Sequence, residues 1–239
     1  MPAVKLETLA LNRKSIESAY VATPEWRYFS PDLLAQYYSV RPLILSHARG
    51  AVIDIGCGYA PFRHIIQPAA IAYHTLDINP EVNADYTEDV QRMSNVPSSK
   101  YDLALCLEVL EHVPNTKAAL AEIHRILKPG GVLILSVPFL SRLHNLPHDY
   151  YRFTVNGLNF ALEEAGFEVV LVKPRGGILA FLGHQLSVVF LSLLWQVPQF
   201  RRMAWLINKL FSKVVYRVDR LVGLRSLFPS GYVCLAKKI

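Results

Sequence analysis

Charged side chains are scarce in this sequence, and acidic ones are almost missing from its last part. Only 18% of the 239 residues are charged, whereas 52% are hydrophobic. From residue 173 onward, eleven Lys or Arg accompany one acid, Asp219, which gives this part a formal charge of +10. The total is +6, so about −4 is left for the first 172 residues. A mildly acidic body with a basic tail indicates two regions with different roles.

Cysteine is rare too, and its spacing excludes two classes of small stabilised domain. Cys57, Cys106 and Cys234 lie far apart within apolar runs, with no CxxC pair and no Cys/His cluster. We therefore predict neither a disulfide framework nor a metal site, but reduced, buried thiols in a cytoplasmic protein. The first fifteen residues contain no long apolar run, so a secretory signal is not expected.

Apolar segments of strand length alternate with segments of helical periodicity along most of the chain. We predict strands at 51–55, 71–78, 82–86, 101–109, 132–137, 167–172 and 232–238, and helices at 61–67, 116–127 and 154–165. The first 50 residues read as helical, with breaks at Pro24, Pro31 and Pro42. This alternation predicts an α/β fold with a doubly wound, mostly parallel, seven-stranded sheet.

Three domains or segments follow from this pattern. We predict a helical N-terminal cap at residues 1–50 and a core formed by residues 51–173 and 230–239. Between the last two strands, residues 174–229 form an apolar, basic helical insertion.

Polar residues follow the predicted strands where a doubly wound fold binds ligands, at the carboxyl ends. Asp54 precedes Gly56 and Gly58, whose missing side chains allow a sharp turn and close approach of a ligand. Asp77 ends the second strand, where it can accept both hydroxyls of a ribose. Glu88 and Asp89 come before the fourth strand, where a carboxylate can accept from an adenine amino group.

The segments DIGCGYAPF, LDIN, EDV, YDLALCLEVLEHV and ILKPGGVLILSVP occur in that order. Together they resemble the class I S-adenosylmethionine-dependent methyltransferases, in particular the group with ubiquinone and sugar O-methyltransferases. The resemblance covers about residues 48–173, and it implies S-adenosylmethionine as the cofactor. The cofactor-binding residues that it implies are Asp54, Gly56, Cys57, Gly58, Asp77, Ile78, Asp89, Val90, Cys106 and Leu107.

By this resemblance Asp54 orders the glycine loop and reaches the methionine amino group, directly or through water. Asp77 holds the ribose, Ile78 packs on adenine, and Asp89 with the Val90 backbone binds the adenine edge. The loop at 56–58 passes under the methionine part. Backbone carbonyls near the methionine amine come from Cys106 and Leu107. Read singly, Asp77 and Asp89 are also ordinary turn or loop acids, and Glu88 is an alternative adenine contact.

A nicotinamide-binding Rossmann domain is the nearest rival fold. It expects a third glycine in G-x-G-x-x-G, whereas this chain has Pro61 at that position. A proline there also alters the helix start that receives a pyrophosphate.

The loop at 138–154, PFLSRLHNLPHDYYRFT, is the best candidate for contact with the methyl acceptor. A hydroxyl acceptor needs a base, and a histidine side chain commonly serves this role near neutral pH, so His148 is the candidate base. Asp149 is a candidate to orient His148, and Arg152 is a candidate to bind an anionic acceptor. In the structural alternative, Asp149 and Arg152 pin the loop. His144 is a weaker candidate base, and His112 is expected to begin a helix or to line the site.

The segment 178–224 combines an uncharged run at 178–195 with a second run that carries Lys and Arg at helical intervals. We predict a helical hairpin that contacts a membrane surface from the cytoplasmic side. A homodimer interface and a lid over the substrate remain alternatives. Nucleic acid is not an expected partner, because the segment is apolar and contains no known binding module.

These observations predict a methyltransferase that acts on an oxygen of a glycan, lipid-linked or other small-molecule acceptor at a membrane surface. Methylation of a soluble metabolite is the nearest alternative. A non-catalytic cofactor-binding scaffold and an oxidoreductase are rivals of other classes.

Overall fold

The computed structural model describes Ile16, Tyr20 and residues 23–239, which fall into two compact units. We call Ser39–Pro174 with Gly231–Ile239 the sheet unit, and the described residues up to Tyr38 with Arg175–Ser230 the hairpin unit. The boundary between Tyr38 and Ser39 falls inside one helix. Of the predicted cap at 1–50, residues 1–15, 17–19, 21 and 22 lie outside the described part.

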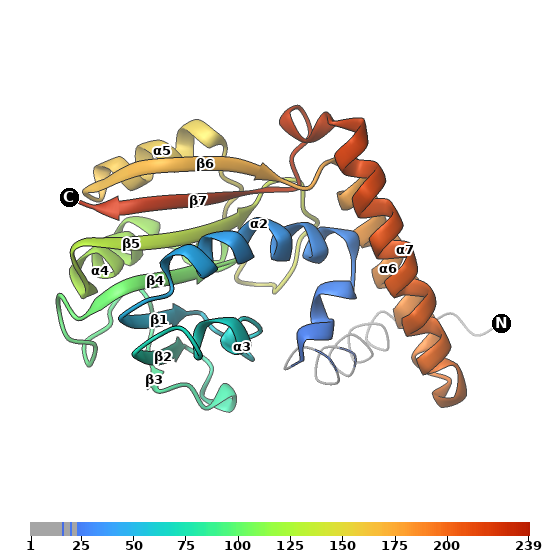
Figure 1. The fold of residues 1–239 in the computed structure, drawn as a ribbon, viewed down its shortest axis with the longest axis horizontal. Coiled ribbons are helices and arrows are strands. Elements are labelled where there is room, and N and C mark those ends of the chain that lie inside the picture. The colour runs from blue at the N-terminus through green and yellow to red at the C-terminus, as the bar shows by residue number, and fades with distance from the viewer. Residues whose placement is uncertain (1–15, 17–19, 21–22) are drawn as a thin grey trace. The chain divides into compact units, whose positions relative to one another are not determined.

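The sheet unit contains a seven-stranded sheet in the order β3-β2-β1-β4-β5-β7-β6 (Figure 1). The strands are β1 Ala51–Ile55, β2 Ala72–Asp77, β3 Tyr86–Thr87, β4 Tyr101–Leu107, β5 Leu127–Pro138, β6 Phe167–Arg175 and β7 Gly231–Lys238. Strands β1 to β5 pair in parallel, and β7 runs antiparallel to β5. The predicted doubly wound, mostly parallel sheet is confirmed.

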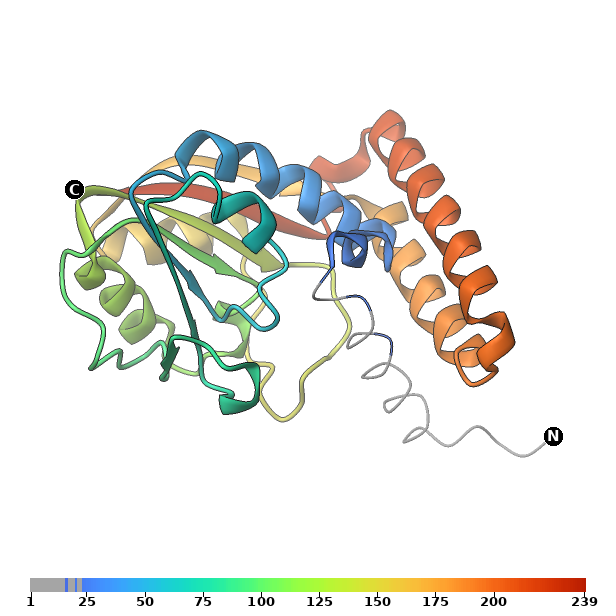
Figure 2. The same ribbon diagram turned by 60° about the horizontal axis from the view of Figure 1, so that its bottom comes forward.

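Helices cover both faces of this sheet (Figures 1 and 2). α3 (Arg63–Ile66) and the C-terminal part of α2 (Pro31–His47) lie on one face, and α4 (Thr116–Ile126) and α5 (Val155–Glu164) lie on the other. The buried residues of α4 are Ala119, Leu120, Ile123 and Ile126, which is the stripe that the sequence predicts. Strands covered on both faces explain the almost continuous apolar runs of β4 and β5.

The strand order reverses between β1 and β4, and this reversal determines where a ligand can bind. The chain moves outward from β1 to β2 and β3, and then returns to the other side of β1 with β4 and β5. Connections that leave β1 and β4 in opposite directions open a crevice at the carboxyl ends of these strands.

Three local predictions were wrong. The predicted strand at 82–86 is a 3-10 turn, η2 (Pro80–Val82), followed by the two-residue β3. The turn forms because Asn79 accepts a hydrogen bond from the Glu81 N–H and Asn83 adopts a left-handed conformation. β4 ends at Leu107 rather than at 109, because Glu108 has a φ of 57°. β5 begins at Leu127 rather than at 132, so residues 128–131, between the predicted helix and strand, belong to the strand.

Pro42 does not break a helix, contrary to the prediction. It lies inside α2 on an exposed side, where water can replace the hydrogen bond that proline cannot donate.

The hairpin unit contains η1 (Pro24–Tyr28), α6 (Ile178–Leu194), η4 (Pro198–Phe200), α7 (Arg201–Val222) and η5 (Leu224–Ser226). α6 and α7 lie side by side (Figures 1 and 2). Asp219 of α7 accepts hydrogen bonds from the N–H groups of Gly177, Leu179 and Ala180, so it caps the start of α6. Within the described residues, no helix has the length and hydrophobicity that a membrane crossing requires.

Candidate functional site

A cavity of about 550 Å³ opens at the crevice beside β1, β2 and β4. Its volume lies within the range of small-molecule sites. Five of the predicted cofactor residues line it, namely Gly56, Asp77, Ile78, Asp89 and Val90. The candidate base His148 lines it too, as does His112. The structure thus brings residues from five separate parts of the sequence to one cavity.

The glycine bend after β1 has two physical requirements. Gly56 has a φ of 63°, a conformation that other residues adopt at a cost. A Cβ on Gly56 would also lie 2.3 Å from Cγ2 of Val109, which follows β4. The missing side chain therefore lets Val109 approach the bend. Gly58 has no neighbouring atom within 4 Å of its Cβ position, so the outer part of the bend is open.

Asp77 joins the glycine bend to the loop after β2. Its Oδ2 accepts a hydrogen bond of 2.8 Å from the Gly58 N–H, and its Oδ1 accepts one of 2.9 Å from the Asn79 N–H. A carboxylate can accept about four hydrogen bonds, so both oxygens keep capacity for ligand hydroxyls. Ile78, 68% exposed, forms an apolar wall beside it.

The acids that follow β3 are held in place by amide side chains. Both oxygens of Asp89 accept hydrogen bonds from the Gln91 side chain, at 3.1 and 2.8 Å. Glu88 accepts from the backbone and side-chain amides of Asn95. Both carboxylates line the cavity, so either one can meet an amino group there.

Besides Gly58, four of the predicted cofactor residues are not on the cavity lining, namely Asp54, Cys57, Cys106 and Leu107. Asp54 is 3% exposed and accepts a hydrogen bond of 2.9 Å from the Tyr73 hydroxyl, and burial raises its pKa to about 7. Cys57 and Cys106 are free, buried thiols, and burial raises the pKa of each. Leu107 is the last residue of β4. The contacts predicted for Asp54, Cys106 and Leu107 involve backbone or water, and they stay predictions.

The loop from 139 to 154 lines the cavity with Asn145, His148 and Tyr150, and hydrogen bonds join it to the segment after β4. The Tyr150 N–H donates to the Glu111 carbonyl at 2.8 Å, and the Tyr151 hydroxyl donates to the Pro114 carbonyl at 2.8 Å. His148 Nδ1 lies 3.0 Å from the Tyr150 hydroxyl. This contact orients one ring nitrogen of His148 while the ring itself stays exposed at the cavity.

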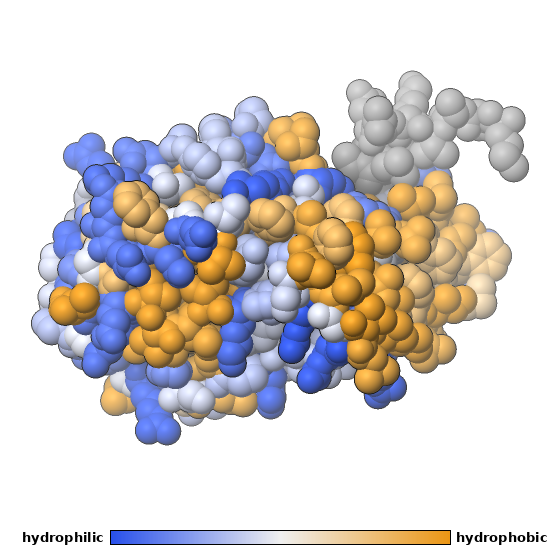
Figure 3. Space-filling view, turned by 90° about the horizontal axis from the view of Figure 1, so that it is seen from above, coloured by the Kyte–Doolittle hydropathy of each residue, from blue (hydrophilic) through white to orange (hydrophobic). Residues whose placement is uncertain are grey.

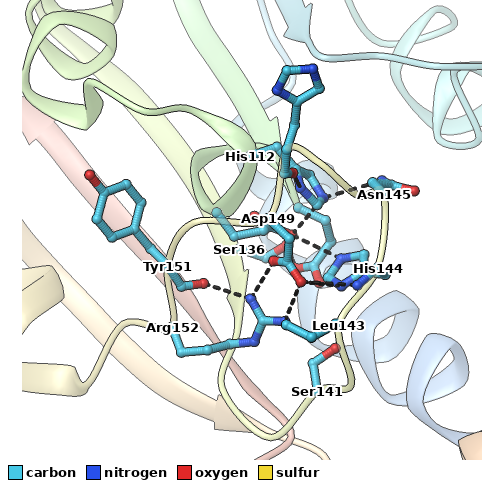
Figure 4. A network of polar contacts seen from close by, with 12 residues as sticks. His112, Ser136, Ser141, Leu143, His144, Asn145, Asp149, Tyr151 and Arg152 are labelled. Carbon is cyan, nitrogen blue, oxygen red and sulfur yellow. Dashed lines mark hydrogen bonds and ion pairs between the residues drawn. The ribbon is translucent and has the colours of Figure 1, made fainter.

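Asp149 and Arg152 form an ion pair that fixes this loop (Figure 4). Two guanidinium nitrogens contact the two carboxylate oxygens at 2.6 and 2.9 Å, and the His144 N–H donates to Asp149 at 2.9 Å. Arg152 also donates to the Arg142 carbonyl at 3.0 Å. The hydrogen bonds from Arg152 hold the pKa of Asp149 well below its usual range. These contacts favour the loop-pinning alternative, and direct catalytic roles for Asp149 and Arg152 stay predictions.

Glu108 and Glu111 follow β4 beside the cavity, and the sequence predicted no role for either of them. Glu108 lines the cavity and accepts a hydrogen bond of 2.8 Å from the Ser136 hydroxyl. The signal that could have identified them is the run LEVLEH directly after a strand.

Glu111 is fully buried, and neither of its carboxylate oxygens accepts a hydrogen bond from a described residue. Nε2 of His112 and Nε2 of His144 lie 3.6 and 3.8 Å from one of these oxygens. One carboxylate and two imidazoles are a donor set that a divalent cation can use, although the sequence predicted no metal site.

The sequence of this chain matches a family of known proteins. The sequence model of the methyltransferase domain matches residues 26–172. The chain is 31% identical over 155 residues to a ubiquinone biosynthesis O-methyltransferase of Xanthomonas oryzae pv. oryzae. The match covers 59% of this chain and 57% of that relative, so the chain spans little more than half of its length.

Solved structures of low sequence identity share the fold. A SAM-dependent methyltransferase from Archaeoglobus fulgidus has a TM-score of 0.56 at 20% identity, over 87% of this chain and 95% of that one. The 4+2 cyclase SpnF has a TM-score of 0.60 at 17% identity, over 84% of this chain and 80% of that one. The fold therefore also occurs in a protein named for another chemistry.

Proposed function

The chain belongs to the methyltransferase-domain family of S-adenosylmethionine-dependent enzymes with the class I fold, and we propose that it methylates an oxygen of a small-molecule or lipid-linked acceptor. The observation that carries this proposal is the position of Asp77. Its carboxylate is fixed by the N–H groups of Gly58 and Asn79, and it faces a cavity of nucleoside size. A hydroxyl pair of a ribose is the natural partner of such a carboxylate.

The donor side of the reaction needs only binding and orientation from the protein. S-adenosylmethionine supplies an activated methyl group on its sulfonium when bound. Asp77, Ile78 and either Glu88 or Asp89 would hold the adenosine part, and the open bend at Gly58 would accommodate the methionine part. The remaining task is to bring an acceptor oxygen in line with the methyl group.

For the acceptor side we propose His148 as the general base. Its ring lies at the cavity, and the Tyr150 hydroxyl at Nδ1 orients it. A histidine so placed can remove the proton of an acceptor hydroxyl as the oxygen–carbon bond forms. Asp149 and Arg152 support this role by fixing the loop that carries His148.

We further propose that the acceptor is a glycan, a prenylated ring or another lipid-linked molecule, and that residues 178–224 contact the inner face of a membrane from the cytoplasm. The basic, apolar composition of this segment and the free, buried state of all three cysteines support this. The name of the Xanthomonas relative supports an O-methyl acceptor.

The test is transfer of labelled methyl from S-adenosylmethionine into a lipid extract and, separately, into an aqueous metabolite extract. We expect label in the lipid fraction, and liposomes or detergent should raise the rate. His148→Ala should lower turnover at least about 100-fold while leaving the affinity for S-adenosylhomocysteine unchanged. His47→Ala is the matched control, because His47 ends α2 and does not line the cavity.

Label in the aqueous fraction alone would favour a soluble acceptor. Cofactor binding without transfer to either fraction would favour the second candidate, a non-catalytic cofactor-binding protein. This candidate is worth retaining because SpnF shows that a protein with this fold can be named for chemistry other than methyl transfer. Unchanged turnover of His148→Ala would exclude His148 as the base.

A further inference from the structure

Helix α7 presents an exposed apolar row of side chains next to a basic row, in which Lys209 and Lys213 are half-buried and Lys209 pairs with Glu25. The apolar row consists of Met203, Ile207, Leu210, Val214, Val218 and Leu221, each between 41% and 86% exposed. The basic row consists of Arg202, Lys209, Lys213, Arg217 and Arg220. Each basic residue stands one position before a member of the apolar row. One position is a rotation of about 100° around a helix, so the two rows are neighbours along its whole length.

The rotation of α7 is fixed by polar contacts on its third, buried row. The Asn208 side chain donates to the carbonyls of Tyr28 and Phe29, both at 2.9 Å. The Ser212 hydroxyl also donates to the Tyr28 carbonyl. Near the other end, Asp219 caps α6 through three backbone N–H groups. The helix therefore cannot turn its apolar row inward without losing buried hydrogen bonds.

The exposed apolar surface continues onto α6. Leu182, Leu186, Val189 and Leu193 recur there at helical spacing, and all four are exposed. A groove of about 420 Å³ lies between the two helices, lined mainly by apolar residues such as Phe190, Ile207 and Phe211. Figure 3 shows this broad hydrophobic area over the hairpin. Exposed apolar areas of this kind mark contact with a membrane or another protein.

A second, larger cavity of about 700 Å³ lies beside the basic row; we call it the cationic pocket. Three cations from consecutive turns of α7 line it together with aromatic rings and two leucines. They are Lys213, Arg217, Arg220, Tyr28, Tyr38, Tyr216, Leu34 and Leu221. Tyr38 and Tyr216 stack with their ring centroids 5.2 Å apart. The Lys213 ammonium lies 5.1 Å from the Tyr28 ring centroid.

No carboxylate among the described residues pairs with these three cations. The single acid of segment 174–230, Asp219, is buried, and its carboxylate is occupied by the α6 cap. The pocket therefore carries three cations, and no described carboxylate neutralises them. Guanidinium and ammonium groups in such a setting bind phosphate oxygens.

We propose that the cationic pocket binds the phosphate of an anionic phospholipid while the apolar rows of α6 and α7 lie among the acyl chains of the same leaflet. One lipid molecule has both chemistries that the hairpin presents, a phosphate for the basic row and hydrocarbon for the neighbouring apolar row. Tyr38 and Tyr216 suit the polar–apolar boundary, where tyrosine is enriched in membrane proteins. This inference rests on the membrane contact proposed above for residues 178–224, but it needs neither methyl transfer nor the cofactor.

The test is binding of the full chain to vesicles without any cofactor. We expect tighter binding to vesicles with 30% phosphatidylglycerol than to pure phosphatidylcholine. The triple variant Lys213→Gln/Arg217→Gln/Arg220→Gln should lose about 100-fold in affinity for the anionic vesicles. The matched control is Arg41→Gln/Arg92→Gln/Lys173→Gln, which removes the same charge from exposed positions of the sheet unit and should lose less than about threefold. Thermal unfolding confirms that all variants are folded.

Two further measurements separate the alternatives. Leu210→Ser/Val218→Ser should also weaken vesicle binding, because it disrupts the apolar row and leaves the charges in place. Glycerol phosphate in solution should compete only weakly with the vesicles. If the chain instead binds glycerol phosphate tightly, and the serine variant still does so, the ligand of the pocket is a soluble phosphate. Equal losses in the two charge variants, or no binding to anionic vesicles, would overturn the proposal. If the wild-type chain forms dimers but does not bind vesicles, and the serine variant is monomeric, the apolar surface binds a second copy of the chain.

Discussion

Replacing Asp54 by Asn should change how stability depends on pH, because Asp54 is an acid buried inside the sheet. Burial raises its pKa from 3.8 to about 7, while the hydrogen bond from Tyr73 opposes this rise. The folded protein then holds a proton on Asp54 that the unfolded chain releases at a much lower pH. A raised pKa in the folded state means stability that is fully present below about pH 4 and is lost as the pH rises through 7.

The size of the effect follows from these two pKa values. Ionising Asp54 in the folded state costs roughly 4 kcal/mol in total, and roughly 2.5 kcal/mol of this falls between pH 5 and 8. The wild-type chain without ligand should lose about that much unfolding free energy over this interval. Asp54→Asn keeps an acceptor for Tyr73 but has no proton to release, so its loss should be smaller by the same amount.

Urea unfolding at several pH values between 5 and 8 measures this difference. Tyr73→Phe provides an internal comparison: removal of the hydrogen bond that stabilises the ionised acid should move the pH-dependent interval upward. Asp149 has the opposite sign, because its pKa is lowered, and its stabilising effect is lost only as the solution becomes strongly acidic. Identical pH dependence in the wild type and in Asp54→Asn would refute the reasoning.

Three further predictions concern the cavity and its loop. Asp77→Ala should weaken binding of S-adenosylhomocysteine about 100-fold in calorimetry, since two charge-assisted hydrogen bonds are lost; unchanged affinity would remove Asp77 from the site. Gly56→Ala should lower the unfolding free energy by about 1–3 kcal/mol. Adding Val109→Ala should restore only part of this free energy, because the strain of the positive φ at residue 56 remains. Full restoration would show that backbone strain does not contribute. Asp149→Asn should speed tryptic cleavage in the loop 139–154 and leave cofactor affinity intact, because it breaks the pair with Arg152 without touching the cavity; equal cleavage rates would contradict the pinning role.

The sheet and its helices were predictable because their signals are local and strong. The apolar stripe on α4 indicates a helix with one buried face, and the unbroken apolar runs of β4 and β5 indicate strands covered on both faces. The alternation of helices and strands predicts a parallel sheet. The boundaries that the sequence missed depend on single backbone angles. Glu108 ends β4 because it has a positive φ, and its residue type does not predict that conformation.

The site was predictable only in part for the same reason. Asp77 and the glycines lie at strand ends, so their meeting follows from topology. The burial of Glu111 between His112 and His144, and the pairing of Asp149 with Arg152, arise from how one long loop folds back on the segment after β4. Such contacts depend on the path of the loop, which residue spacing does not reveal.

A crystal structure of the chain with S-adenosylhomocysteine tests the central claim most directly. The ribose hydroxyls should lie within hydrogen-bonding distance of both Asp77 oxygens, with the adenine against Ile78 and its amino group at Glu88 or Asp89. A ligand bound elsewhere, or an Asp77 that still contacts only Gly58 and Asn79 beside an empty cavity, would contradict the account.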